Sequence, residues 1–474
     1  MTSGEASRFR LSAIVFFVLF ASYACFAQHP NWNSTSRLAL TAQLSQHGEL
    51  SINGYEKLTG DRASTPSGYY SDKAPSMSLL AVPMSLLVTR FFTIEPDKFG
   101  TRWWTLYMYL CTLSVAGFFS ALAAAAMFLF VSRTTASIDA ALIASLTFGL
   151  ATPMFGWSTV FFGHATAAAL LLLGFIAWQD GDGGRWLRIA RFFAGGLALG
   201  VATGVEFPTA IPAAIIGVAM VIRLLTREQL ATAAELLGAA LLGGVIGLAP
   251  TLIYNDAAFG SPLHLGYSNV VGFDGMKSGF FGIGLPSLGV VKELLVGSYR
   301  GVLWFCPALI VLIVAWCFAV RQRALREVSI VTALVTAWYL FYNAGYIYWD
   351  GGWSTGPRFL TPAFGLPCLV LGLVWPSLPS RIKPVFLAVI GLSVLMSLAA
   401  VSVDMAAPEN DKNPLLNYIL PSFLSGNLMS TLSYYVLPRP SILHLVPILA
   451  VWALGLLLIA RESSRDEPVR RGAG

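Results

Sequence analysis

Apolar stretches long enough to cross a bilayer recur along almost the whole of this chain of 474 residues. Hydrophobic residues make up 56% of the sequence and charged residues only 11%, whereas soluble domains carry about 25% charged residues. This shortage of charge excludes an ordinary soluble globular protein and predicts an all-α polytopic membrane protein with no nucleic-acid partner. We expect about twelve transmembrane helices, over residues 9–27, 103–131, 138–157, 165–179, 192–205, 207–222, 232–254, 301–320, 327–346, 361–375, 384–402 and 441–460.

Arginines gather in the short connections between these stretches, and short basic loops mark the cytoplasmic side of a membrane. This pattern predicts that both termini are cytoplasmic, in a multi-pass protein of a bacterial inner membrane. The first stretch follows Arg8 and Arg10, as a signal anchor does, and we expect it to be retained rather than cleaved because many spans follow. The charged tail, residues 461–474, is expected to be a disordered cytoplasmic segment.

The rest of the chain, residues 1–460, is expected to be a single multi-span membrane domain. Its largest polar segment is the extracytoplasmic loop 28–102, which contains an apolar run over 74–92. Pro75 and Pro83 interrupt this run, and counting it as a span would place the later arginine-rich loops outside. We therefore expect a re-entrant or interfacial helix, which membranes tolerate where protein covers it. Leu38 and neighbouring apolar residues predict an amphipathic helix on the membrane surface within the same loop.

Asp72 and Lys73 stand side by side just before that apolar run. At a water–lipid boundary the lysine can hold a phosphate, and the aspartate can take a proton from an attacking hydroxyl. The alternative is a surface ion pair at a helix start, with Pro75 in the first turn.

Two further titratable residues lie beside apolar stretches. His164 follows Phe161-Phe162-Gly163 and is suited to carrying a proton, or it simply lies at the membrane interface. Glu206 lies between two apolar runs, where an acid is either functional or part of a turn that reaches water. No second histidine has ligand spacing, so we predict no metal or other cofactor, although a divalent ion stays open.

The segment Asp350–Phe359 combines glycines, aromatic residues and Arg358. Glycines allow the backbone to approach a ligand closely, and an arginine at the start of a span suits bidentate binding of a phosphate. An interfacial arginine within an aromatic belt is the alternative. His264 lies in the polar segment 255–267, which either lines an acceptor groove or forms a plain turn.

Several of these segments resemble the GT-C superfamily of integral membrane glycosyltransferases, in particular the protein O-mannosyltransferase and lipid A aminoarabinose transferase branch. The start of the first-loop helix, Trp32 to Ala39, the stretch Asp72-Lys73-Ala74-Pro75, and Glu206-Phe207-Pro208 carry the likeness. Two positions that often carry catalytic acids in the family correspond to Ser34 and His164, neither of which is an acid. Four residues therefore stay as candidates for the general base: Asp72, Asp61, His164 and Glu206.

The resemblance implies transfer of a sugar from a polyprenyl phosphate to a lipid or glycan acceptor on the periplasmic or extracellular face. Lys73 and Arg358 would bind the donor phosphate, and the acceptor or loop contacts would come from Arg37, Tyr70, Asp350 and His264. A transporter or flippase for a lipid-linked or polar solute is one alternative, because transporters also place charge inside membranes. An inactive scaffold of the same fold is another.

Overall fold

The structure, a computed structural model, describes residues 3–179 and 183–471. Helices dominate this part of the chain, because inside lipid an apolar segment must satisfy its own backbone polar groups. The long apolar helices are α1 (Ser3–Ala24), α5 (Phe118–Thr135), α9 (Arg185–Val205), α10 (Ala210–Arg227), α11 (Leu230–Phe259), α15 (Arg326–Gly345), α17 (Lys383–Val403) and α20 (Val446–Arg471). The shorter helices are α2 (Trp32–His47), α3 (Ser76–Val88), α4 (Arg102–Thr112), α6 (Ile138–Leu150), α7 (Met154–Trp157), α8 (Gly163–Ala177), α12 (Leu288–Val296), α13 (Val302–Phe305), α14 (Ala308–Ala319), α16 (Gly365–Val374), α18 (Leu420–Leu424) and α19 (Leu432–Val436).

Every predicted span contains helix in the structure, and two of them, 138–157 and 301–320, are each divided into two helices. Nine stretches of the described chain are long and apolar enough to cross a membrane, and each overlaps a predicted span. The other three predicted spans contain the shorter apolar helices α6, α8 and α14. Pro153 precedes α7 and Pro307 precedes α14, and proline interrupts the hydrogen-bonded ladder of a helix. The predicted fold class, an all-α polytopic membrane protein, is confirmed.

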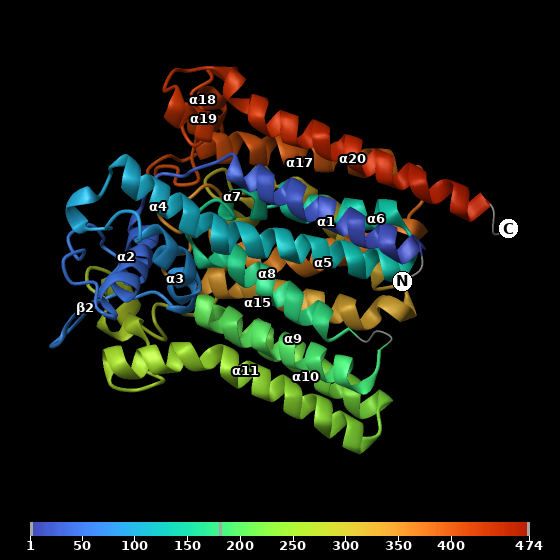
Figure 1. The fold of residues 1–474 in the computed structure, drawn as a ribbon, viewed down its shortest axis with the longest axis horizontal. Helices are drawn as coiled ribbons and strands as arrows, with labels where there is room; N and C mark the ends of the chain where they lie inside the picture. Colours follow the sequence, from blue (N-terminus) through green and yellow to red (C-terminus); the bar gives the residue numbers. More distant parts are fainter. Residues whose placement is uncertain (1–2, 180–182, 472–474) are drawn as a thin grey trace.

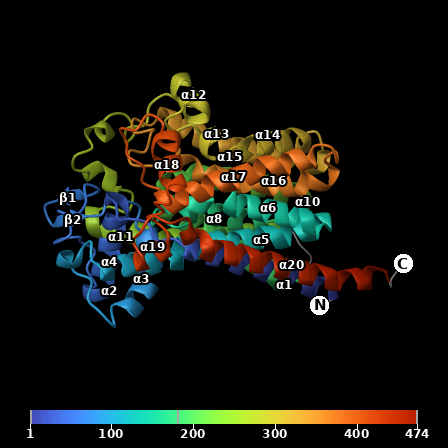
Figure 2. The same ribbon diagram turned by 90° about the horizontal axis from the view of Figure 1, so that it is seen from above.

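The long helices run roughly side by side, and α2, α3 and a small hairpin gather at one end of the bundle (Figure 1), called the loop end below. The hairpin pairs β1 (Ala63–Thr65) with β2 (Gly68–Tyr70) in antiparallel register. A view turned by 90° shows the same segregation (Figure 2). Helix α1 begins and α20 ends at the opposite end (Figure 1), as expected if both termini lie on one side of the membrane.

Two sequence predictions are wrong in detail. The first-loop helix α2 is not a surface helix, because the side chains from Ser34 to Gln43 are buried and the helix packs against α3. Its hydroxyls find partners in this interior, as Ser36 does at Ser71 Oγ (2.8 Å). The predicted disordered tail is helical, because α20 continues through its charged residues to Arg471. Residues 472–474 lie outside the described part of the chain.

Helix α3 has 13 residues, which corresponds to about 20 Å of helix and is too short to cross the hydrocarbon core. It packs against α2, α4 and α9. The re-entrant position of residues 74–92 stays a prediction.

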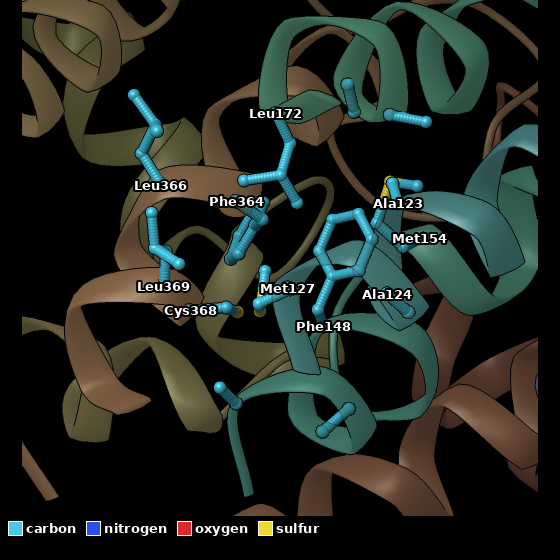
Figure 3. Close-up of a cluster of buried hydrophobic side chains, with 14 of the residues drawn as sticks. Ala123, Ala124, Met127, Phe148, Met154, Leu172, Phe364, Leu366, Cys368 and Leu369 are labelled. Atoms are coloured by element: carbon cyan, nitrogen blue, oxygen red, sulfur yellow. The ribbon is translucent and has the colours of Figure 1, made fainter. Parts of the chain in front are cut away.

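The core of the bundle is built from alternating large and small apolar side chains. Figure 3 shows Phe148 of α6 lying close to Ala123, Ala124 and Met127 of α5, with residues of α16 packed nearby. The alanines let neighbouring helices approach closely, as small residues do in membrane bundles.

Glycines hold α9 and α11 in close contact. Gly196 and Gly200 of α9 face Ala240 and Gly244 of α11 so closely that a Cβ at either glycine would overlap the partner backbone. Gly243 of α11 faces the backbone of α9 at Phe193 in the same way. Four-residue spacing of small side chains is the usual means of close helix packing inside membranes.

Gly200→Leu is therefore expected to lower the free energy of unfolding by about 1–3 kcal/mol, because the larger side chain must push the two helices apart. Denaturant titration of the purified protein in detergent measures this change. Gly217→Leu on α10 is the matched control, since nothing lies within 4 Å of a Cβ there. An equal effect of the two substitutions would show that the α9–α11 contact is not tight.

Candidate active site

Lys73 lies between two carboxylates at the loop end. Its Nζ is 3.0 Å from Oδ2 of Asp72 and 3.2 Å from Oδ2 of Asp61. The exposed fractions of the three side chains are 14%, 1% and 10%, so these charges interact in a medium far less polar than water. The cluster forms because Asp72 and Lys73 occupy the short connection between β2 and α3, and the hydroxyl of Tyr254 on α11 donates to Ser71 O (3.4 Å).

Burial sets the protonation of this cluster. It raises the pKa of Asp72 to about 6, and the Asp61 carboxylate adds to the effect against the opposing attraction of Lys73. Burial lowers the pKa of Lys73, but the neighbouring Asp61 and Asp72 carboxylates together raise it by more than burial lowers it. The pKa of Lys73 is therefore above its usual value, and the ammonium stays charged at neutral pH. Among the described residues, the buried Oδ1 of Asp72 has no hydrogen-bond partner. Asp72 thus offers a free oxygen and a pKa near the working range of a general base.

Arg37 is buried and joins three segments of the chain. Its Nη2 donates to Oε1 of Glu206 (2.8 Å), its Nη1 donates to Ala74 O (2.9 Å), and its Nε donates to Oδ1 of Asn33 (2.9 Å). Arg37 therefore fixes α2 against the start of α3 and the end of α9. A planar guanidinium can donate hydrogen bonds in several fixed directions at once, so arginine suits this role better than lysine would.

His164 is the second partner of the Glu206 carboxylate. It lies in the first turn of α8, and its Nδ1 is 3.8 Å from Oε1 of Glu206. Glu206 follows α9 directly and has a side chain 12% exposed, so it lies at the loop end and not midway along the spans. The structure thus brings together Arg37, His164 and Glu206, which the sequence presented as separate candidates.

Arg358 lies beside this group. Its guanidinium carbon is 5.0 Å from the ring centres of both Phe162 and Phe359, and its buried Nε has no hydrogen-bond partner among the described residues. The ring of Tyr346 packs on Phe359 (5.6 Å), which faces Arg358, and on Tyr348 (5.8 Å). Tyr348 in turn packs on Phe273 (5.6 Å), which faces Lys73. The two cations therefore lie at the same end of the bundle, linked by a series of ring contacts.

A covering loop, residues 260–287, closes over Lys73. Phe273 places its ring centre 5.9 Å from the Lys73 Nζ, and Gly266 packs so closely on Asp72 that a Cβ would lie 3.1 Å from its Cα. The loop is tied down at both sides, since Val271 N donates to Arg62 O (3.0 Å) and Gly284 N donates to Gly345 O (2.8 Å). The covering loop keeps water away from the cluster and strengthens its electrostatics.

Arg300 and Tyr346 are two site residues that the sequence analysis missed. Arg300 is fully buried, stacks on Tyr299 (3.9 Å), and donates to Asp350 O (3.0 Å) and Gly352 O (2.7 Å). It thereby holds the glycine segment whose Gly351 packs on the Arg358 side chain. A signal was present for Tyr346, because Trp338, Tyr342 and Tyr346 recur at the four-residue spacing that stacks side chains along one helix face.

The other residues predicted as acceptor or loop contacts, Asp350, His264 and Tyr70, bond to or pack on neighbouring residues, and their role in acceptor binding stays a prediction. The Asp350 carboxylate accepts from Tyr299 OH (3.2 Å) and from Gly352 N (3.2 Å). The His264 ring is 2.6 Å from Oδ1 of Asn269 within the covering loop, and it stacks on Phe259. Tyr70 meets the same Phe259 ring from β2. In the part of the chain that the structure describes, no group of three His, Cys, Asp or Glu side chains could hold a metal ion.

No protein-family model matches the sequence, and no curated protein is significantly similar to it. Solved structures do match over nearly the whole chain. The apo structure of ArnT from Cupriavidus metallidurans has a TM-score of 0.52 and 16% identity, covering 95% of this chain and 76% of its own. The same protein bound to undecaprenyl phosphate has a TM-score of 0.54 and 15% identity, covering 98% and 78%. The chain shares the fold of this GT-C protein. The GT-C resemblance drawn from the short motifs is therefore confirmed at the level of the fold.

Arg37→Gln is expected to lower the free energy of unfolding by about 3–5 kcal/mol, because it leaves Glu206 largely buried without its cation. Adding Glu206→Gln should recover part of the loss, and denaturant titration in detergent measures both. Arg133→Gln, at an exposed position of α5, is the control. No recovery in the double variant would mean that the pair does not carry the effect.

Proposed function

We propose that this protein transfers a sugar from a polyprenyl phosphate to a hydroxyl group of an acceptor at the outer face of a bacterial inner membrane. The observation that carries the proposal is the gathering of two half-buried cations and one buried carboxylate at the loop end. Lys73 lies 3.0 Å from Asp72, whose Oδ1 has no hydrogen-bond partner among the described residues. Ring contacts from Phe273 through Tyr348 and Tyr346 to Phe359 connect the surroundings of Lys73 with those of Arg358. Cations in a partly dry site suit a phosphate whose isoprenoid tail remains in the lipid.

The donor phosphate would meet Lys73 and Arg358. Binding replaces part of the attraction that Lys73 now makes with Asp61 and Asp72, and it supplies the Arg358 guanidinium with the acceptor atoms that its Nε lacks. The cations then stabilise the negative charge that grows on the phosphate as it leaves, which is where fixed charges accelerate a reaction most.

Asp72 is our choice as general base. As the acceptor oxygen forms its bond to the anomeric carbon, the bond from that carbon to the phosphate oxygen breaks, and the acceptor proton passes to Asp72 Oδ1. Polyprenyl phosphate leaves as the second product, and displacement in one step inverts the sugar. Glu206 is less suited because Arg37 holds its carboxylate at 2.8 Å. His164 is less suited because Trp157, Phe162 and Phe359 surround its ring.

Lys73→Ala is expected to weaken binding of undecaprenyl phosphate at least tenfold and to lower sugar transfer by about 10²–10³, the usual cost of losing one donor to a developing anion. Binding to the purified protein and transfer from labelled undecaprenyl-phosphate sugars measure the two effects. Lys98→Ala is the matched control, because this lysine pairs with Glu95 on a more exposed surface. Unchanged binding and turnover would remove Lys73 from the mechanism.

The rate of transfer is expected to fall as the pH drops through about 6. Asp72, with its pKa raised to about 6, becomes protonated below that pH and can no longer accept the proton. The rate at pH 5 should be about one tenth of the plateau value. Asp72→Asn should remove this acidic limb and lower the plateau by about 10²–10⁴ while undecaprenyl phosphate still binds. An unaltered acidic limb in that variant would assign the base to another residue.

A transporter or flippase predicts a different result from the same purified protein. In vesicles it would move labelled lipid or solute across the bilayer without consuming the donor sugar. The charges of the candidate site lie at the loop end, whereas transporters bind solutes near the membrane midplane. An inactive scaffold would show neither activity.

A further inference from the structure

A group of cations lies at the end of the bundle opposite to the candidate active site. It occupies the connection between α14 and α15 and the connection between α16 and α17, and it is called the basic patch below: Arg321, Arg323, Arg326, Arg381 and Lys383. Helix α15 has 20 residues and ends directly before Tyr346, so its start lies about 30 Å from that site residue. In Figure 2 the helices that carry the basic patch reach toward the side on which both termini lie.

Hydrogen bonds hold the two connections together. Gln322 Nε2 donates to Ser377 Oγ (2.9 Å), and the Ser377 hydroxyl donates to Val374 O (2.8 Å). Trp316 on α14 donates from its Nε1 to Ser329 O on α15 (2.8 Å). Helix α14 also packs against α16 and α17. The cations of the two connections therefore belong to one surface with a fixed frame.

The basic patch lacks carboxylate partners, unlike several other arginines at this end of the bundle. Arg185 pairs with Glu235, and Arg227 pairs with Glu327 (3.4 Å), the acid next to the basic patch in the sequence. Within the described part of the chain, no carboxylate forms an ion pair with any cation of the basic patch. Its four arginines are exposed. Like charges held close together repel one another, so an anion from outside the chain would stabilise this surface.

Exposed apolar side chains continue from the basic patch along two helices. On α15, Arg326 is followed at four-residue spacing by Ile330 and Leu334, each 50% exposed, which places all three on one helix face. On α17, Val385 and Leu392 are 60% and 46% exposed. Their seven-residue spacing again places them on one face. A ligand that matches the whole surface therefore carries a negative charge and long apolar chains.

We propose that the basic patch binds the headgroups of anionic phospholipids in the adjoining leaflet, with their acyl chains against the exposed faces of α15 and α17. Guanidinium groups form paired hydrogen bonds with phosphate oxygens, and each lysine or arginine near an anionic membrane surface adds to the attraction. The Lys383 ammonium lies 5.6 Å from the ring centre of Trp375, which keeps it at the start of α17. A free phosphate would use the cations alone, whereas a phospholipid also uses the apolar faces.

The test uses the full-length protein, purified in detergent and stripped of lipid, with phosphatidylglycerol and phosphatidylcholine of the same acyl chains as probes. Native mass spectrometry measures the affinity for each lipid. Phosphatidylglycerol should bind about tenfold more tightly than phosphatidylcholine. Substituting Arg321→Gln together with Arg323→Gln should weaken phosphatidylglycerol binding about fivefold or more and leave phosphatidylcholine binding unchanged, because the two arginines act on the lipid charge.

Arg133→Gln together with Arg185→Gln is the matched control. Arg133 lies in the last turn of α5 and Arg185 begins α9, so this variant loses the same charge from the same end of the bundle but outside the basic patch. It should keep both lipid affinities. Equal binding of the two lipids, or an equal effect of the two double variants, would overturn the inference. Displacement of phosphatidylglycerol by an equal concentration of glycerol phosphate would also overturn it, because the site would then recognise a free phosphate.

This inference is independent of the proposed function, because the basic patch takes no part in sugar transfer. Lys73→Ala should keep the preference for phosphatidylglycerol, and the variant with Arg321→Gln and Arg323→Gln should keep sugar transfer. A failure of one proposal is therefore distinguishable from a failure of the other.

Discussion

The buried pairing of Lys73 with Asp61 and Asp72 is the interaction on which the loop end depends. Removing charges from water is costly, so each one needs partners that hold it in place. The hairpin, the start of α3 and the covering loop 260–287 converge on this cluster and exclude solvent from it. The same exclusion of water raises the pKa of Asp72 to about 6. The carboxylates of Asp61 and Asp72 keep Lys73 charged. One environment thus supplies both a phosphate-binding cation and a weakly acidic carboxyl group.

The membrane scaffold determines where this environment forms. Close contact between the glycines of α9 and α11 fixes the relative position of two helices whose ends both reach the site. Helix α9 ends at Val205, directly before Glu206, and α11 ends at Phe259, directly before the covering loop. A shift of α9 relative to α11 would therefore move Glu206, the partner of Arg37, relative to the covering loop that lies over Lys73.

Much of the fold was readable from apolar pattern alone, because lipid leaves a long apolar segment few choices other than a helix. The site was only partly readable. Lys73, Asp72 and Arg358 were recognisable as charged residues next to apolar stretches. Arg37 was predicted only as an acceptor or loop contact, because its actual partner Glu206 is 169 positions away in the sequence. Burial of α2 was likewise hidden, since its serines and threonines read as a polar surface until their partners on other segments are known.

The sequence by itself determined that the chain is a bundle of apolar helices, where most of those helices lie, and which charged residues stand next to them. These properties follow from local composition, because lipid selects segments by hydropathy and loops by charge. Only the tertiary structure decided which charges meet. Packing of segments distant in sequence brings Lys73 to Asp61 and Arg37 to Glu206 in largely buried surroundings, and the strength of an electrostatic interaction depends on distance and on the polarity of those surroundings.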